Sequence, residues 1–92
     1  MPGIVRTVLG DIAADQLGVT YMHEHLIIDS EIVARDFAHI HLPSQTEAIA
    51  EVGLCKSQGV QTMVDCMPTG SGRSALKLAA ISKATGMNIV AT

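Results

Sequence analysis

The sequence is poor in aromatic residues and in cysteine. Its 92 residues include one Tyr, one Phe, no Trp and only two Cys. A small independent domain usually completes its core with bulky aromatics or disulfides, and this chain has neither. Hydrophobic residues still make up 48% of it, mostly aliphatic ones, which is typical of parallel strands covered by helices. The composition therefore indicates a piece of a larger α/β protein.

Charge and hydropathy exclude several kinds of partner. The net charge is −3 and the pI is about 5.7, so the chain lacks the basic surface that nucleic acid requires. No apolar run reaches the roughly 18 residues of a membrane span, and no signal-peptide pattern is evident. We therefore expect no nucleic acid, no membrane and a cytoplasmic location. The spacing of Cys55 and Cys66 fits no zinc or redox motif, so we expect two reduced, buried thiols.

The order of apolar segments predicts two strand–helix units and a third strand. Short β-branched runs indicate strands at 19–26, 60–67 and 87–91, and amphipathic segments indicate helices at about 44–57 and 73–85. Such alternation predicts a parallel sheet with right-handed crossovers and helices on one side.

Local signals mark the ends of the two helices. Ser44 and Glu47 have the spacing of a capping box, and Gly59 and Gly86 are expected to end the helices in the left-handed conformation. The residues expected to face the core are Ala48, Ile49, Val52 and Cys55 in the first helix and Leu76, Ala80 and Ala84 in the second.

The segments outside these units are a lead-in and one long connection. Residues 4–9 alternate imperfectly and are expected to form a hairpin with the segment after a turn at Gly10-Asp11. Residues 29–43 form a mixed polar connection that is long for a loop between a strand and a helix.

The tripeptide His23-Glu24-His25 carries the strongest chemical signal. It lies late in the first expected strand, where residues i and i+2 share a face. His23 and His25 are therefore expected side by side, with Glu24 pointing the other way in a structural role. Neutral imidazole is a favoured ligand of divalent metals, so the pair is a candidate metal site. From spacing alone, a pair of core or hydrogen-bonded histidines is the favoured alternative.

The surrounding residues resemble the phosphotriesterase family of amidohydrolases. Residues 18–26, Gly-Val-Thr-Tyr-Met-His-Glu-His-Leu, resemble its N-terminal signature, with Tyr21 where the family usually has Leu. Residues 59–65, 72–73 and 88–92 resemble later blocks of the family in the same order. The resemblance implies the N-terminal part of a (β/α)8 TIM barrel, with about three strands and two helices preceded by a short β-hairpin. Active sites of such barrels lie at the carboxyl ends of the strands.

The same resemblance implies a function. The intact protein would be a metal-dependent hydrolase that cleaves phosphotriester, lactone or carboxylic ester bonds with a metal-activated water. His23 and His25 would be metal ligands, and the expected cofactor is zinc, with two ions per complete site. The expected partners are a small-molecule ester, lactone or organophosphate substrate and, since dimers are frequent in the family, a second copy of the protein.

The length of the chain bears on that function. A (β/α)8 barrel needs about 250 residues. Because the sequence begins with Met1, the missing part is expected to be C-terminal, and residues 1–92 are interpreted as the N-terminal fragment of one barrel domain. The bridging carboxylated lysine, two further histidines and an aspartate that the family places on later strands are not in this sequence. The alternative is a catalytically inactive fragment that retains only a partial metal-binding site.

Several other polar residues have both a structural and a functional interpretation. His39 and His41 are expected to face solvent or to pack in a loop, with a substrate-loop role as the alternative. For Asp65 a buried structural acid is favoured over a metal ligand, and for Arg73 a structural salt bridge over a contact with substrate. Residues 70–72, Gly-Ser-Gly before a helix, could bind phosphate, although such a turn is common.

Overall fold

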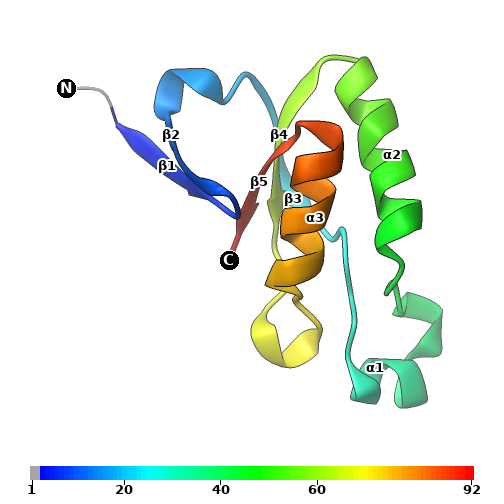
Figure 1. The fold of residues 1–92 in the computed structure, drawn as a ribbon. Coiled ribbons are helices and arrows are strands. Elements are labelled where there is room, and N and C mark those ends of the chain that lie inside the picture. Colours follow the sequence, from blue (N-terminus) through cyan, green and yellow to red (C-terminus); the bar gives the residue numbers. More distant parts are fainter. Residues whose placement is uncertain (1–2) are drawn as a thin grey trace.

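A computed structural model describes residues 3–92, apart from the side chain of Thr69. The elements of these residues, in chain order, are β1 (Ile4–Thr7), β2 (Gly10–Ala13), β3 (Val19–Glu24), α1 (Glu31–Asp36), α2 (Gln45–Ser57), β4 (Val60–Asp65), α3 (Ala75–Thr85) and β5 (Asn88–Ala91). Short 3-10 turns lie at Ala14–Gln16, Ala38–Ile40 and Thr69–Ser71. Figure 1 shows the hairpin of β1 and β2 beside β5, and α1 at the opposite side of the molecule from the start of β4.

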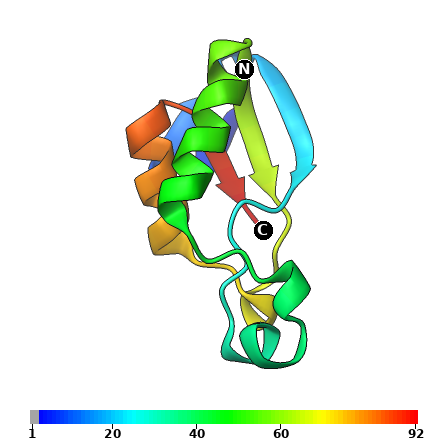
Figure 2. The same ribbon diagram turned by 90° about the vertical axis from the view of Figure 1, so that its right-hand side faces the viewer.

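The strands β3, β4 and β5 form a parallel sheet in this order. Figure 2 shows their arrowheads pointing to the same end of the molecule and both α2 and α3 on one face of the sheet. The predicted strand–helix units and their parallel order are confirmed. The apolar, β-branched sequence of β3 is typical of a buried strand, yet Val19, Tyr21 and Met22 are all exposed. The reason is its position at the edge of the sheet, where it pairs only with β4.

The core lies between the sheet and its two covering helices. It consists of aliphatic and Met side chains, namely Leu26, Ile27, Ala48, Val52, Val60, Met63, Leu78, Ile81, Met87 and Ile89. Fully burying one side chain of this size contributes about 1.5–3 kcal/mol to folding, so the two helices are held mainly by this contact.

The predicted core face is right for α2 and wrong for α3. In α2, Ala48 and Val52 are buried, and the two other predicted residues pack against the core. In α3, Leu76 is 87% exposed, while Leu78 and Ile81 are 0% exposed. This helix has apolar residues on two sides. The side with the larger side chains, Leu78 and Ile81, packs against the sheet.

The helix ends follow the local signals closely. The Ser44 hydroxyl accepts a hydrogen bond from the Glu47 amide at 3.1 Å, as an N-cap does. Gly86 ends α3 with φ 75°, and Gly59 follows α2 with φ 103°, so both predicted left-handed positions are confirmed. The start of α3 was predicted two residues too early, because Ser74 is its N-cap.

The hairpin is confirmed, but its turn is not where the sequence placed it. Gly10 pairs with Thr7 and already belongs to β2, so Val8 and Leu9 form the turn. The Thr7 hydroxyl donates to the Gly10 carbonyl at 2.7 Å and closes this turn. The Val8 amide donates to the Ile89 carbonyl at 2.8 Å, which holds the hairpin against β5.

The long connection 29–43 is partly helical, which the sequence analysis missed. It contains α1 and the 3-10 turn Ala38–Ile40, and Ser30 caps α1 by accepting from the Val33 amide. An antiparallel bridge between Ile28 and Leu42 closes the base of the segment. Figures 1 and 2 place it at the end of the sheet to which the strands point.

Two further expectations concern the cysteines and the membrane. Cys55 and Cys66 are free thiols, and both are half-buried rather than buried. Within residues 3–92 no helix combines the length and apolarity that crossing a bilayer requires. The cytoplasmic location stays a prediction.

Candidate metal centre

The two histidines of the tripeptide lie at the carboxyl end of β3. Tyr21 pairs with Met63 and Glu24 with Asp65, so β3 has one more residue than β4 between these pairs. Such a bulge re-aims side chains and is frequent beside active sites. The rings of His23 and His25 are both exposed, with centroids 5.2 Å apart and planes at 66°.

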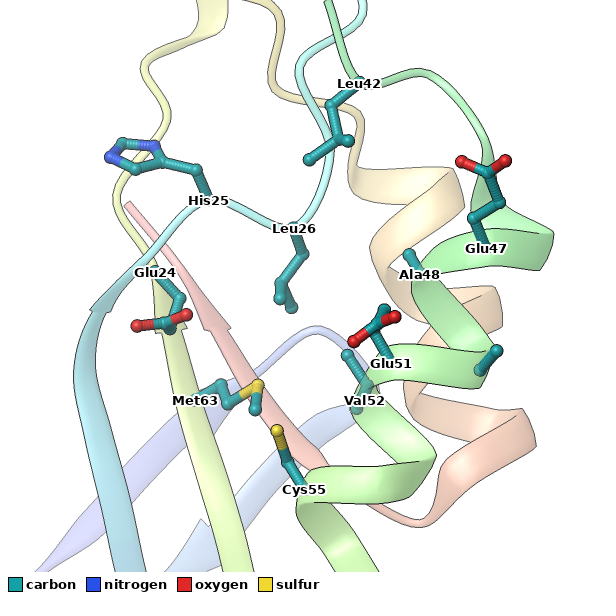
Figure 3. Close-up of a pocket in the computed structure, with 11 residues that line it drawn as sticks. Glu24, His25, Leu26, Leu42, Glu47, Ala48, Glu51, Val52, Cys55 and Met63 are labelled. Carbon is teal, nitrogen blue, oxygen red and sulfur yellow. The ribbon is translucent and has the colours of Figure 1, made fainter. Parts of the chain in front are cut away.

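The rings of His23 and His25 lie side by side, as predicted, and Figure 3 shows the Glu24 side chain pointing in another direction from the His25 ring. Figure 3 shows the ring of His25 pointing away from α2, while the side chain of Leu26 points into the space between β4 and α2. Glu24 is half-buried and, together with His25, lines a cavity of about 580 Å³ that extends to Glu51 and Cys55 of α2 (Figure 3). Both rings are exposed within residues 3–92, so neither histidine is a core residue of this part of the fold.

The spacing of the rings is compatible with a shared metal ion. Two imidazoles bound to one tetrahedral zinc, with Zn–N distances of about 2.0–2.1 Å, would have ring centres about 5 Å apart. Within residues 3–92 there is no group of three or more His, Cys, Asp or Glu side chains placed to hold a metal. His23 and His25 can thus supply two ligands, and further ligands would have to come from elsewhere.

Asp65 supports the backbone next to this pair. Its side chain is 0% exposed, and its two oxygens accept hydrogen bonds at 2.9 Å from the amides of Leu26 and Met67. The Cys66 amide donates to the Glu24 carbonyl at 2.9 Å, which is the last rung between β3 and β4. The strands were predicted to run two residues further. They end at Glu24 and Asp65 because the Leu26 amide donates its hydrogen bond to the Asp65 side chain and not to a strand carbonyl. These contacts agree with the structural interpretation of Asp65.

The second pair of histidines does not form a matching site. His39 is exposed in a 3-10 turn, whereas His41 is half-buried with Nε2 3.5 Å from Oδ1 of Asp29. The ammonium of Lys77 donates to Oδ2 of Asp29 at 2.7 Å and to the Pro43 carbonyl at 2.6 Å. The Lys77 hydrogen bond is the main cause that lowers the pKa of Asp29, and His41 acts in the same direction. His41 therefore packs in the loop as predicted, and Lys77 is a contact that the sequence did not reveal.

The Gly-rich turn and Arg73 have structural contacts. The Gly72 carbonyl accepts from the Asp29 amide at 2.9 Å, and a Cβ on Gly72 would lie 2.6 Å from that nitrogen. Glycine is therefore required for close packing at this point. Arg73 donates to the carbonyl of Thr92, so its observed contact is structural but is not the predicted salt bridge.

Comparison with known proteins agrees with this geometry. The phosphotriesterase family model matches residues 3–92. A phosphotriesterase homology protein of Mycobacterium tuberculosis is 36% identical over 89 residues, which cover 94% of this chain and 27% of the relative. An aryldialkylphosphatase of Saccharolobus solfataricus is 35% identical over 82 residues, covering 87% and 26% of the two chains.

Solved structures show the same relation. A lactonase from Listeria monocytogenes superposes with a TM-score of 0.89 at 36% identity, covering 97% of this chain and 27% of the lactonase. The chain thus spans about 27% of the length of these relatives and has the fold predicted from its sequence, the N-terminal part of a (β/α)8 barrel. The match over residues 3–92, together with the fold, shows that the chain belongs to the phosphotriesterase family.

Proposed function

We propose that the protein containing this sequence is a metal-dependent hydrolase of small-molecule phosphotriesters or lactones. The observation that carries the proposal is the pair of exposed imidazoles, 5.2 Å apart, at the carboxyl end of β3 in a chain of this family. The substrate classes follow from relatives named as an aryldialkylphosphatase and as lactonases. A phosphotriester and a lactone share an electrophilic centre with a polarised oxygen, which one site can attack.

His23 and His25 are proposed to bind a divalent metal through neutral ring nitrogens, with zinc as the expected ion and two ions in a complete site. A bound metal of this kind lowers the pKa of a water ligand and polarises the scissile oxygen of the substrate. The chain itself contributes the position of the two rings, which face away from the core on an edge strand. Segment 29–43 lies at the same end of the sheet.

The proposal is tested with single substitutions in the full-length protein. We expect His23→Ala and His25→Ala each to reduce metal affinity and hydrolysis by more than about 100-fold, because each removes a direct ligand. His39→Ala is the matched control, since His39 is exposed but lies in a turn away from any strand. His41→Ala should also have a much smaller effect. Metal content after dialysis and turnover of an aryl dialkyl phosphate and a lactone are measured, and equal losses in all four variants would refute the proposal.

A second candidate is a fragment that retains only a partial metal site and has no activity. It is favoured by the finding that residues 3–92 bring together no more than two convincing metal ligands. Zinc sites in proteins normally use three or four protein ligands. The same assays on the 92-residue chain alone, with added zinc or cobalt, separate the two candidates. Turnover above that of free metal, lost on replacing both His23 and His25, would contradict the inactive fragment.

A further inference from the structure

We propose that Asp65 is a positioning residue for His25, and this proposal rests on the function proposed above. The carboxylate holds the peptide unit that follows His25 and so fixes the direction of its imidazole at the metal site. Asp65 would not touch the metal or the substrate. It would act on metal affinity through the backbone.

The contacts of Asp65 support this role. Its side chain is 0% exposed, and Oδ2 accepts a hydrogen bond from the amide of Leu26, which lies 39 residues away in the sequence. The regular ladder between β3 and β4 ends where Glu24 faces Asp65. Beyond that rung, the side chain of Asp65 takes the place of a backbone acceptor. Leu26 and Met67 are both buried, so neither amide could be satisfied by water without a rearrangement.

The bond to Leu26 acts directly on the conformation of His25. The peptide group between His25 and Leu26 is planar, so fixing its N–H fixes the ψ angle of His25. On the far side, Leu26 and Ile27 are anchored in the core. Figure 3 shows Leu26 directed into the space between β4 and α2 and the His25 ring directed away from α2. A backbone held at both points leaves the imidazole of His25 little freedom other than its own side-chain rotations.

The two bonds of Asp65 can be separated by substitution. The bond from Oδ1 to the Met67 amide spans two residues, and a serine hydroxyl can form a similar local turn. Asp65→Ser therefore keeps the local bond but cannot reach Leu26. Asp65→Asn keeps the size of the side chain but has one acceptor oxygen, so its NH₂ group would face a backbone N–H.

The matched control is Thr62→Val on the same strand. Thr62 is also 0% exposed, donates to the Leu17 carbonyl at 2.7 Å and accepts from Nδ2 of Asn88 at 3.2 Å. The partners of Thr62 precede β3 and begin β5, so these contacts lie toward the amino end of the sheet, away from Asp65. Thr62→Val thus removes buried hydrogen bonds from the same strand without touching the peptide after His25.

The experiment measures Co²⁺ binding to the full-length protein by visible absorption and chelator competition. We expect Asp65→Ser and Asp65→Asn to weaken binding roughly 10-fold to 100-fold, the usual effect of residues that orient metal ligands. Thr62→Val should bind as the wild type does. Wild-type affinity in a folded Asp65 variant, or an equal loss in Thr62→Val, would overturn the proposal. Unfolding of both Asp65 variants while Thr62→Val folds would do the same, since it would show a purely structural role.

A second readout needs no metal. Hydrogen exchange of the Leu26 amide, followed by NMR in the metal-free protein, should be selectively faster in Asp65→Ser than exchange of the Met63 amide inside β4. Unchanged exchange at Leu26 would refute the proposal that Asp65 holds the peptide unit after His25. If wild-type protein binds no Co²⁺ and His25→Ala changes nothing, the proposed function fails, while the exchange result still decides whether Asp65 holds this peptide.

Discussion

Replacing Lys77 with Met should loosen the segment 29–43 at the carboxyl end of the sheet. The Lys77 ammonium donates both to Asp29, at the start of the segment, and to the Pro43 carbonyl, at its end. Methionine keeps an aliphatic stem of similar size and removes only the charge and its hydrogen bonds. Since the side chains of Lys77 and Asp29 are 30% and 37% exposed, water weakens the ion pair, and we expect a loss of about 1 kcal/mol.

The assay for Lys77→Met is tryptic cleavage after Arg35, which lies exposed in α1. A loss of about 1 kcal/mol raises the population of molecules in which segment 29–43 is open about fivefold. The cleavage rate rises by the same factor when opening is rapid. The control is Lys83→Met, which removes an exposed lysine from the last turn of the same helix. Equal cleavage rates in the two variants would refute the idea that Lys77 ties the segment to α3.

The contact between Lys77 and Asp29 also makes the stability of segment 29–43 depend on pH. The pKa of Asp29 is lowered in the folded protein, first by the Lys77 hydrogen bond and also by His41, against the opposing effect of burial. A carboxyl with a lowered pKa stabilises the fold above its ordinary pKa of about 3.9, and this stabilisation is lost as the pH falls through the lowered value. In Lys77→Met the NMR titration of Asp29 should move upward toward the ordinary value. An unchanged titration would contradict the assigned cause.

Two further comparisons test the fold by urea denaturation. Gly72→Ala should destabilise more than Gly10→Ala by at least about 1 kcal/mol, because both glycines have φ near 125–129° but only Gly72 would place a Cβ against backbone atoms, at 2.6 Å. Leu78→Ala should cost about 2–5 kcal/mol, whereas Leu76→Ala, at a position that is 87% exposed, should change the free energy of unfolding by no more than about 0.5 kcal/mol. Equal effects within either pair would contradict the packing described.

The parts of the fold that could be predicted are those decided by neighbours in the sequence. Ser44 caps α2 through an amide three residues away, and Gly86 ends α3 because its own φ of 75° suits glycine. The buried face of α3 could not be predicted in this way. Leu76 and Leu78 are the same residue type, and which of them is buried depends on the angle at which the helix meets the sheet.

The same distinction separates the two histidines from the residues that support them. His23 and His25 could be found because their spacing predicts neighbouring side chains and because the residues around them resemble the signature of the family. Asp65 and Lys77 meet partners 39 and 48 residues away, and nothing in their local sequence marks those contacts. Both contacts join separate strand–helix units at the carboxyl end of the sheet. The carboxyl end of the sheet, where His23 and His25 lie, is therefore held by contacts between residues far apart in the sequence, which local patterns do not specify.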